Sequence, residues 1–189
     1  MTLSSAERHS DARERLLVRL LDAFEGGLPS PDLSLREVAS RVGTSHALLR
    51  YHFGSLTGVL AAMLTAQRSR DNEALVKTAQ QGTFDELVLA IWRAYTRPGQ
   101  LSRVRSFFHV VSLAAYSPGD FGEFIDSLDD LTMMLASLAE REGHDTEEAL
   151  SMATVAIAAI RGLLLQNVLT PAVHSQDAVN LILRMTKGA

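Results

Sequence analysis

One short stretch of the sequence places side chains that can read a nucleic-acid duplex at helical spacing. Arg50 and Tyr51 stand together, and His46 precedes them by about one turn. Arginine recognises guanine through paired hydrogen bonds to O6 and N7, and tyrosine can contact a phosphate or a thymine methyl group. Thr44 and Ser45 offer hydroxyls to cap the start of such a helix, where backbone N–H groups also attract phosphate. The set predicts a surface for contacts with DNA.

The preceding residues predict a helix that ends in a tight turn. Ser34 and Glu37 have the spacing of a capping box, which satisfies backbone N–H groups at a helix start. Gly43 can adopt the left-handed backbone that often ends a helix. Apolar residues of this helix recur at the spacing of one helical face: Leu35, Val38, Ala39 and Val42.

The helix after the glycine has an apolar side and a polar side. Leu48, Leu49 and Phe53 are expected to pack inward. A helix, a glycine-containing turn and a second helix with outward polar residues form the helix-turn-helix pattern, whose second helix enters the DNA major groove. A further helix over residues 6–24 carries a leucine stripe and completes a three-helix bundle.

The segment REVASRVGTSHALLRYHFGSLTGVLAAML resembles the DNA-binding region of TetR-family transcriptional regulators. The matching residues are Val38-Ala39, Gly43, Ser45, Leu49 and His52-Phe53. The resemblance implies an all-α fold of about nine helices. It implies a helix-turn-helix DNA-binding domain over residues 1–55 and a helical effector-binding and dimerisation domain over residues 56–189. Two positions depart from the family pattern: Leu56 stands where many members have lysine, and Arg50 where many have tyrosine.

Ten residues form the predicted DNA-binding set. They are Ser34, Arg36, Thr44, Ser45, His46, Ala47, Arg50, Tyr51, His52 and Thr57. We expect Arg50 to read a base and Arg36, at a helix start, to bind phosphate. For His52 a hydrogen bond inside the protein is an equal alternative, and for the others the alternative is ordinary surface exposure.

The rest of the chain predicts helices only. Periodic apolar residues, with glycine or proline at the ends, indicate helices over residues 56–80, 84–96, 102–116, 121–142, 147–169 and 176–185. The first of these is apolar at one end and polar in the middle, which suggests a connector between two domains.

The resemblance implies an effector pocket among the C-terminal helices. The predicted ligand-binding residues are Trp92, Tyr95, Arg105, Phe108, His109, Ser112, Tyr116, Met134 and Met152. Ordinary core packing is the competing use of most of them. Because little charge looks buried in the sequence, we expect an uncharged or lipophilic effector.

The resemblance also implies that the last two long helices pair with those of a second copy. The predicted dimerisation residues are Ala153, Ala156, Ile157, Ile160, Leu164, Asn167, Leu181, Ile182 and Met185. The small residues among them would permit close approach of helices, and intramolecular core is the alternative for half of the set. Two copies would read a pseudo-palindromic operator with recognition helices roughly 34–36 Å apart.

Composition sets limits on the class of protein. The 189 residues are 47% hydrophobic and 21% charged, with no cysteine, so disulfides and cysteine metal sites are excluded. The net charge is −4, but residues 1–70 carry a net +2 and residues 71–189 a net −6. No signal-peptide core is present, and Arg161 and Asn167 interrupt the most apolar run, so we expect a cytoplasmic protein that does not bind a membrane.

No catalytic motif is present, and the six histidines lack the spacing of metal ligands. We therefore expect neither an enzyme nor a cofactor or metal. The sequence predicts a homodimeric, DNA-binding transcriptional regulator, a repressor released from its double-stranded operator by a small-molecule effector. The alternatives are a helix-turn-helix adaptor that binds protein but not DNA, and an all-α enzyme or haem protein.

Overall fold

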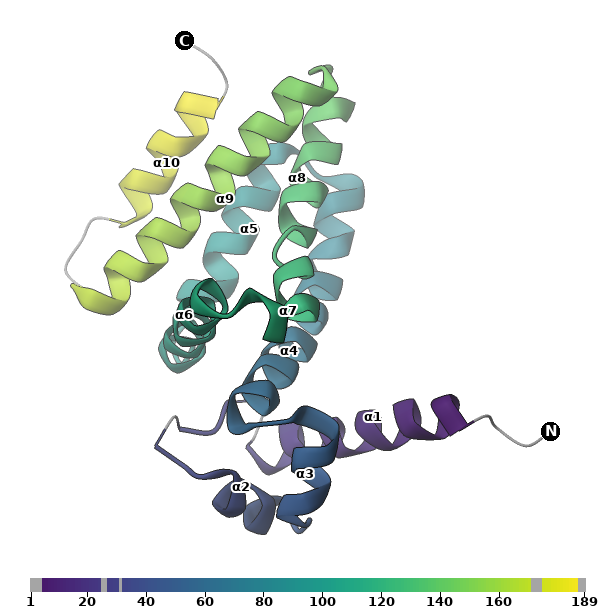
Figure 1. Ribbon diagram of the computed structural model, residues 1–189. Helices are drawn as coiled ribbons and strands as arrows, with labels where there is room; N and C mark the ends of the chain where they lie inside the picture. Colours follow the sequence, from purple (N-terminus) through teal and green to yellow (C-terminus); the bar gives the residue numbers. More distant parts are fainter. Residues whose placement is uncertain (1–4, 25–26, 31, 171–174, 187–189) are drawn as a thin grey trace. The chain divides into compact units, whose positions relative to one another are not determined.

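The computed structural model describes residues 5–24, 27–30, 32–170 and 175–186. These residues form α-helices and one short 3-10 helix and contain no strand, which confirms the predicted all-α fold (Figure 1). The elements are α1 (Ser5–Ala23), α2 (Leu35–Val42), α3 (His46–Phe53), α4 (Leu56–Gln81), α5 (Phe84–Thr96), α6 (Leu101–Tyr116), η1 (Pro118–Asp120), α7 (Gly122–Asp126), α8 (Asp130–Arg141), α9 (Thr146–Leu169) and α10 (Ser175–Thr186).

The chain divides into two compact units. Unit 1 comprises Met1–Gln67 and Val110–Phe124, and unit 2 comprises Arg68–His109 and Ile125–Ala189. Helices α4 and α6 therefore each contribute residues to both units. The functional boundary predicted between residues 55 and 56 stays a prediction.

Unit 1 is built around the predicted three-helix bundle. Leu20 of α1, Val38 of α2 and Leu49 of α3 are fully buried, and the start of α4 adds Val59 and Met63. These side chains form one apolar cluster, so the first turns of α4 belong to the same core as the helix-turn-helix. The predicted inward packing of Leu49 and Phe53 is thus confirmed, and this core fixes the orientation of α3.

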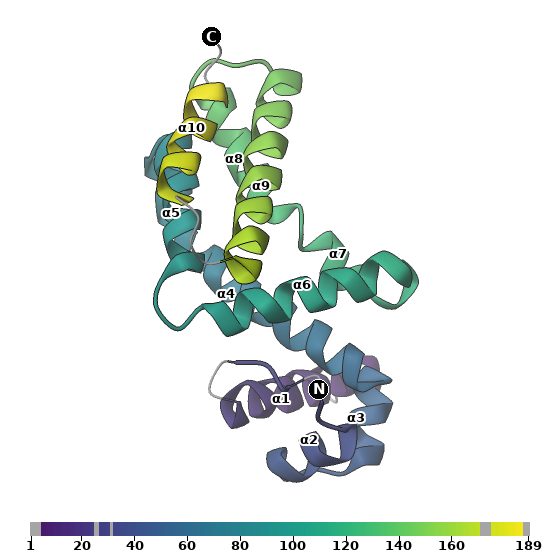
Figure 2. The ribbon, with the colours of Figure 1, turned by 90° about the vertical axis from the view of Figure 1, so that its left-hand side faces the viewer.

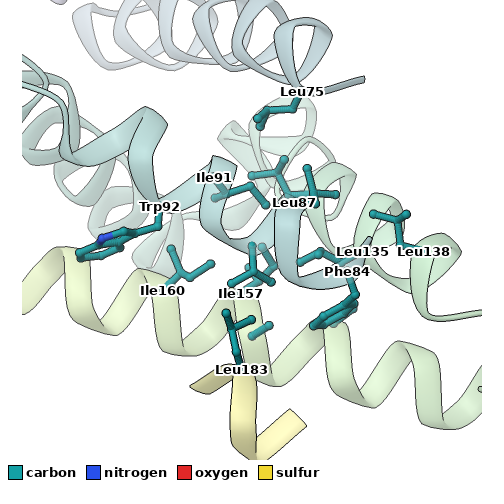
Figure 3. Close-up of a cluster of buried hydrophobic side chains, with 14 of the residues drawn as sticks. Leu75, Phe84, Leu87, Ile91, Trp92, Leu135, Leu138, Ile157, Ile160 and Leu183 are labelled. Carbon is teal, nitrogen blue, oxygen red and sulfur yellow. The ribbon is translucent and has the colours of Figure 1, made fainter. Parts of the chain in front are cut away.

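Unit 2 is a bundle in which α9 packs against α8 and α10, while α5 contacts all three (Figures 1 and 2). Its core is aromatic and aliphatic. Figure 3 shows Phe84, Leu87 and Ile91 of α5 near Leu135 of α8 and Ile157 of α9, while Trp92 of α5 lies beside Ile160 of α9. Thr83 and Glu86 form a capping box at the start of α5, and Asp145 caps α9 by accepting the Glu148 N–H at 2.9 Å.

The single helix predicted over residues 121–142 is wrong. The segment contains the short helix α7 and the longer α8, with a break at residues 127–129. At the break the carbonyl oxygens of Ser127 and Leu128 accept hydrogen bonds from Arg68 (2.9 Å) and Arg161 (2.7 Å). Because the two arginines are distant in sequence, no local pattern could have predicted this interruption.

Helix α9 is long and apolar enough to cross a membrane by length and composition, with a mean hydropathy of 1.6 over its best window. About a third of that window (33%) is buried inside unit 2, where α9 supplies core residues. The core helix of a globular bundle meets the same criterion.

Candidate functional site

The turn between α2 and α3 is set by local hydrogen bonds. Gly43 has a φ of 68°, and its N–H bonds back to the carbonyl of Ser40 at 3.1 Å. Ser45 then caps α3, since its hydroxyl accepts the Leu48 N–H at 3.1 Å. Both features were predicted and are confirmed. They fix where α3 begins and therefore which of its side chains face outward.

Two arginines link α1 to the end of α2 next to this turn. Nη2 of Arg19 on α1 donates to the carbonyls of Val42 and Gly43, at 2.8 Å each. Nε of Arg41 donates to the carbonyl of Ala23 at 3.2 Å, and its guanidinium lies 4.5 Å from the centre of the Phe24 ring. These two positive charges are therefore occupied in positioning the helix-turn-helix.

The outward face of α3 carries most of the predicted base-reading residues. Arg50 and Ala47 are exposed, Tyr51 is 70% exposed and His46 is half-buried. The prediction that Leu48 packs inward is wrong, because its side chain is 41% exposed. On this eight-residue helix Leu48 lies one turn before Tyr51, so it adds an apolar group to the same face.

His52 belongs to a cluster of three rings on unit 1. Its ring centre lies 4.7 Å from that of His9 on α1 and 5.0 Å from that of Tyr51. Its Nδ1 is buried without a hydrogen-bond partner. Burial lowers the pKa of His52, and the nearby charges of His9 and Arg13 lower it further. The cluster connects the end of α3 to α1.

The predicted phosphate-binding residues lie at helix starts. The capping box of α2 is confirmed: Ser34 accepts the Glu37 N–H at 3.3 Å, and the Glu37 carboxylate accepts the Ser34 N–H at 2.7 Å. Hydrogen bonds from Ser34 lower the pKa of Glu37, so a carboxylate already occupies this helix start. Arg36 is exposed beside it. Thr57 is half-buried in the first turn of α4, and Thr44 is half-buried in the turn before α3.

The residues predicted to bind an effector have varied environments. Trp92 is buried in the core of unit 2, and several others pack partly buried against that core: Tyr95, Phe108, Met134 and Met152. His109 is half-buried, and Arg105 is exposed. Ser112 and Tyr116 are exposed and belong to unit 1, with Tyr116 88% exposed.

A buried polar cluster in unit 2 was missed by sequence reasoning. Arg68 of α4 is only 4% exposed, and Asn72, one turn later, is 5% exposed. Arg161 of α9 is half-buried. The premise that little charge is buried is therefore wrong. The sequence does contain one signal that could have revealed this cluster: Arg161 is a lone charge inside an otherwise apolar helical run.

The predicted dimerisation residues divide into two groups. Five lie in the core of unit 2: Ala153, Ala156, Ile157, Ile160 and Leu164. Asn167 and Ile182 are half-buried, whereas Leu181 and Met185 on α10 are 49% and 68% exposed. The opposite side of α9 presents exposed Val155, Leu165 and Leu169.

Solved structures share this fold. A transcriptional regulator from Rhodococcus sp. Rha1 superposes with a TM-score of 0.65 and 19% identity, over 92% of this chain and 95% of its own. The TetR transcriptional regulator from Legionella pneumophila gives a TM-score of 0.65 and 18% identity, over 98% and 99%. No protein-family model and no curated protein matches the sequence. The likeness confirms the resemblance at the level of fold: the chain has the fold of TetR-type transcriptional regulators.

Proposed function

We propose that the protein is a DNA-binding transcriptional regulator of the TetR type, acting as a cytoplasmic homodimer without enzymatic activity. The observation that carries the proposal is the outward face of α3, where Arg50, Tyr51 and Leu48 are exposed on a helix whose start is set by Gly43 and Ser45. A duplex major groove accepts such a helix and offers guanine acceptors and thymine methyl groups to these side chains.

The distribution of arginines in unit 1 supports this proposal. Four of them hold other groups of the unit: Arg13, Arg15, Arg19 and Arg41. Arg36 and Arg50 are exposed, and neither makes an ion pair within the part of the chain that the structure describes. Among the arginine side chains that the structure describes in unit 1, these two are available to DNA, Arg50 for a base and Arg36 for phosphate.

Two copies of the chain would pair through the exposed side of α9. Exposed residues on this side alternate at spacings of four and three, as in a coiled-coil seam: Ser151, Val155, Ala158, Gly162, Leu165 and Leu169. The stripe lies opposite the buried face of α9, and Ala158 and Gly162 would let a second helix approach closely. Exposed Leu181 and Met185 on α10 would extend the same interface.

The proposed regulatory mechanism is a shift between two states of the dimer. An effector bound among the helices of unit 2 would favour a state whose recognition helices are wrongly spaced for the operator, so the protein would act as a repressor. Helix α4 would carry the coupling, because Val59 and Met63 lie in the core of unit 1 and Leu75 in that of unit 2.

Selection of bound fragments from genomic DNA by the purified protein tests the proposal. We expect enrichment of a pseudo-palindromic site, with affinity that falls steeply as salt rises. The rival function is a helix-turn-helix adaptor that binds protein only. The net charge of −4 and the engaged arginines favour it. No enriched site, and weak binding that does not respond to salt, would leave the adaptor as the better account.

A further inference from the structure

Arg68 is a buried cation without a carboxylate partner among the described residues. Its Nη2 donates to the Ser127 carbonyl at 2.9 Å, and its guanidinium lies 5.3 Å from the centre of the Phe107 ring. Its Nε is buried without a hydrogen-bond partner. Among the residues that the structure describes, it forms no salt bridge. Burial of a charge with so little compensation is costly, so the arrangement calls for an explanation.

Arg161 places a second guanidinium in the same region. Its Nη2 donates to the Leu128 carbonyl at 2.7 Å, next to the carbonyl bound by Arg68. Burial lowers the pKa of Arg161 and the charge of Arg68 lowers it further, while Asp129 and Tyr95 act in the opposite direction. The two positive charges therefore repel each other, and Asp129, which acts in the opposite direction, is itself exposed.

Tyr95 adds a neutral donor to the pair. Its hydroxyl is buried without a hydrogen-bond partner, and burial raises its pKa, so it keeps its proton at neutral pH. The charges of Arg68, Arg103 and Arg161 act to lower the pKa of this hydroxyl, and the charge of Asp71 acts to raise it. A buried hydroxyl beside two cations can donate a hydrogen bond to an anion placed between them.

The neighbouring charges do not neutralise the two arginines. Asp71 forms an ion pair with Arg103, with 2.6 Å between the nitrogen and oxygen atoms. Asp130 accepts a hydrogen bond from Asn72 at 3.1 Å. The plainer interpretation is that Arg68 and Arg161 serve only to hold the α7–α8 break. That role uses one N–H group of each guanidinium, and it leaves the Tyr95 hydroxyl unexplained.

We infer that Arg68, Arg161 and Tyr95 form the anion-binding part of the effector site and that the effector is a small organic carboxylate. This inference rests on the proposed function and names the chemical class of its effector, in place of the uncharged effector expected from the sequence. Tyr95 also lines a pocket of 210 Å³ in unit 2, whose wall includes Val104, Leu164 and Val168 but neither Arg68 nor Arg161. That volume lies below the range of about 300–1,000 Å³ typical of drug-sized ligands, so the apolar body of the acid is small.

The test uses the full chain and three acids: benzoate, phenylacetate and hexanoate. Their amides serve as uncharged counterparts of the same shape, and inorganic phosphate serves as a plain anion, all at constant ionic strength. We expect at least one acid to raise the Tm, by roughly 5–10 °C at a concentration a hundredfold above its Kd. The amides and phosphate should leave the Tm unchanged.

Variants assign the effect to the cluster. Arg161→Met should weaken binding of the acid by about 10- to 100-fold in calorimetric titration, and Arg161→Lys should restore part of it. Tyr95→Phe should weaken binding by a smaller factor. Arg93→Met, at an exposed arginine of α5 in the same unit, is the matched control and should bind the acid as the unchanged protein does. The restoration by lysine separates loss of charge from damage to the fold.

Several results would overturn the inference. They are an equal response to acids and amides, an equal response to phosphate, no response to any acid at millimolar concentration, or unchanged affinity in Arg161→Met. These experiments contain no DNA, whereas the genomic selection contains no acid. Binding of acids without any selected DNA site would therefore refute the proposed regulator and keep the anion site, and the reverse pattern would do the opposite.

Discussion

Gly58 in the first turn of α4 lies against the carbonyl group of Phe53, the last residue of α3. A Cβ atom at Gly58 would stand 1.9 Å from that oxygen and 3.1 Å from its carbon. Both neighbours are backbone atoms, which cannot rotate away as a side chain can. The end of α3 and the start of α4 are thus in direct backbone contact within unit 1, and the Ser55 hydroxyl between them accepts a hydrogen bond from the Gly58 N–H at 3.1 Å.

Gly58→Ala should therefore displace α3 from α4. We expect a loss of unfolding free energy of about 1–3 kcal/mol, the usual cost of forcing extra volume into a packed site. DNA affinity should fall as well, because the orientation of α3 changes. Urea denaturation and a binding titration measure the two effects. Gly122→Ala, where a Cβ meets nothing within 4 Å, is the matched control. Equal stability of the two variants would contradict the expected clash.

Arg50→Ala should remove a base contact. We expect a loss of about 1–3 kcal/mol on the selected operator and a relaxed preference at one base position, with little change on unrelated DNA. Competitive titration against single-base operator variants measures both. Because Arg50 is exposed and makes no ion pair within the described residues, the fold should be unaffected, and the melting temperature provides that control.

Arg36→Ala should behave differently. The side chain is exposed at the start of α2, so its loss should weaken binding to all sequences alike. The slope of log affinity against log salt should fall by about one unit. If Arg36→Ala and Arg50→Ala reduced specific and non-specific affinity equally, the assignment of one residue to phosphate and the other to a base would be wrong.

His52 makes the stability of unit 1 dependent on pH. Burial and the charges of His9 and Arg13 lower its pKa in the folded protein, so the unfolded chain takes up the proton first. The unfolding free energy is then highest above the ordinary pKa of about 6.5 and falls as the pH drops through that value. Urea denaturation between neutral and mildly acidic pH should show this fall, and His52→Gln should flatten it. His9→Gln removes one repelling charge and should reduce the fall without abolishing it.

The helix-turn-helix could be predicted because local residues determine it. Ser34 and Glu37 set the start of α2, Gly43 sets its end, and Ser45 sets the start of α3. Leu48 could not be assigned in the same way, because an eight-residue helix has too few apolar positions to distinguish packing residues from exposed ones. Its exposure follows from how α3 packs on α1 and α4, which is a tertiary property.

Elsewhere the predicted helix boundary was wrong because it depends on contacts between residues distant in sequence. The break between α7 and α8 depends on Arg68 and Arg161, which lie 59 and 33 residues from the carbonyls they bind. The same two side chains belong to the polar cluster of unit 2, so these two long-range hydrogen bonds bear on both a helix boundary and the effector chemistry that we propose. Helix α9 presents a different difficulty, because apolar residues occupy nearly its whole circumference and the pattern does not reveal which stripe faces its own core.

Val155→Arg tests the outer stripe of α9 as the dimer interface. A charge buried without a partner within the seam should raise the dimer dissociation constant by more than about 100-fold, or ~3 kcal/mol. Sedimentation velocity should then show single chains where the unchanged protein shows dimers, and operator affinity should fall although α3 is intact. Ala74→Arg, at an exposed small residue of α4, is the charge control and should remain dimeric. Arg50→Ala should also remain dimeric while losing base preference, because it lies on α3 and not on the stripe. A Val155→Arg protein that stays dimeric would exclude this stripe, and the pairing would have to use another surface of the chain.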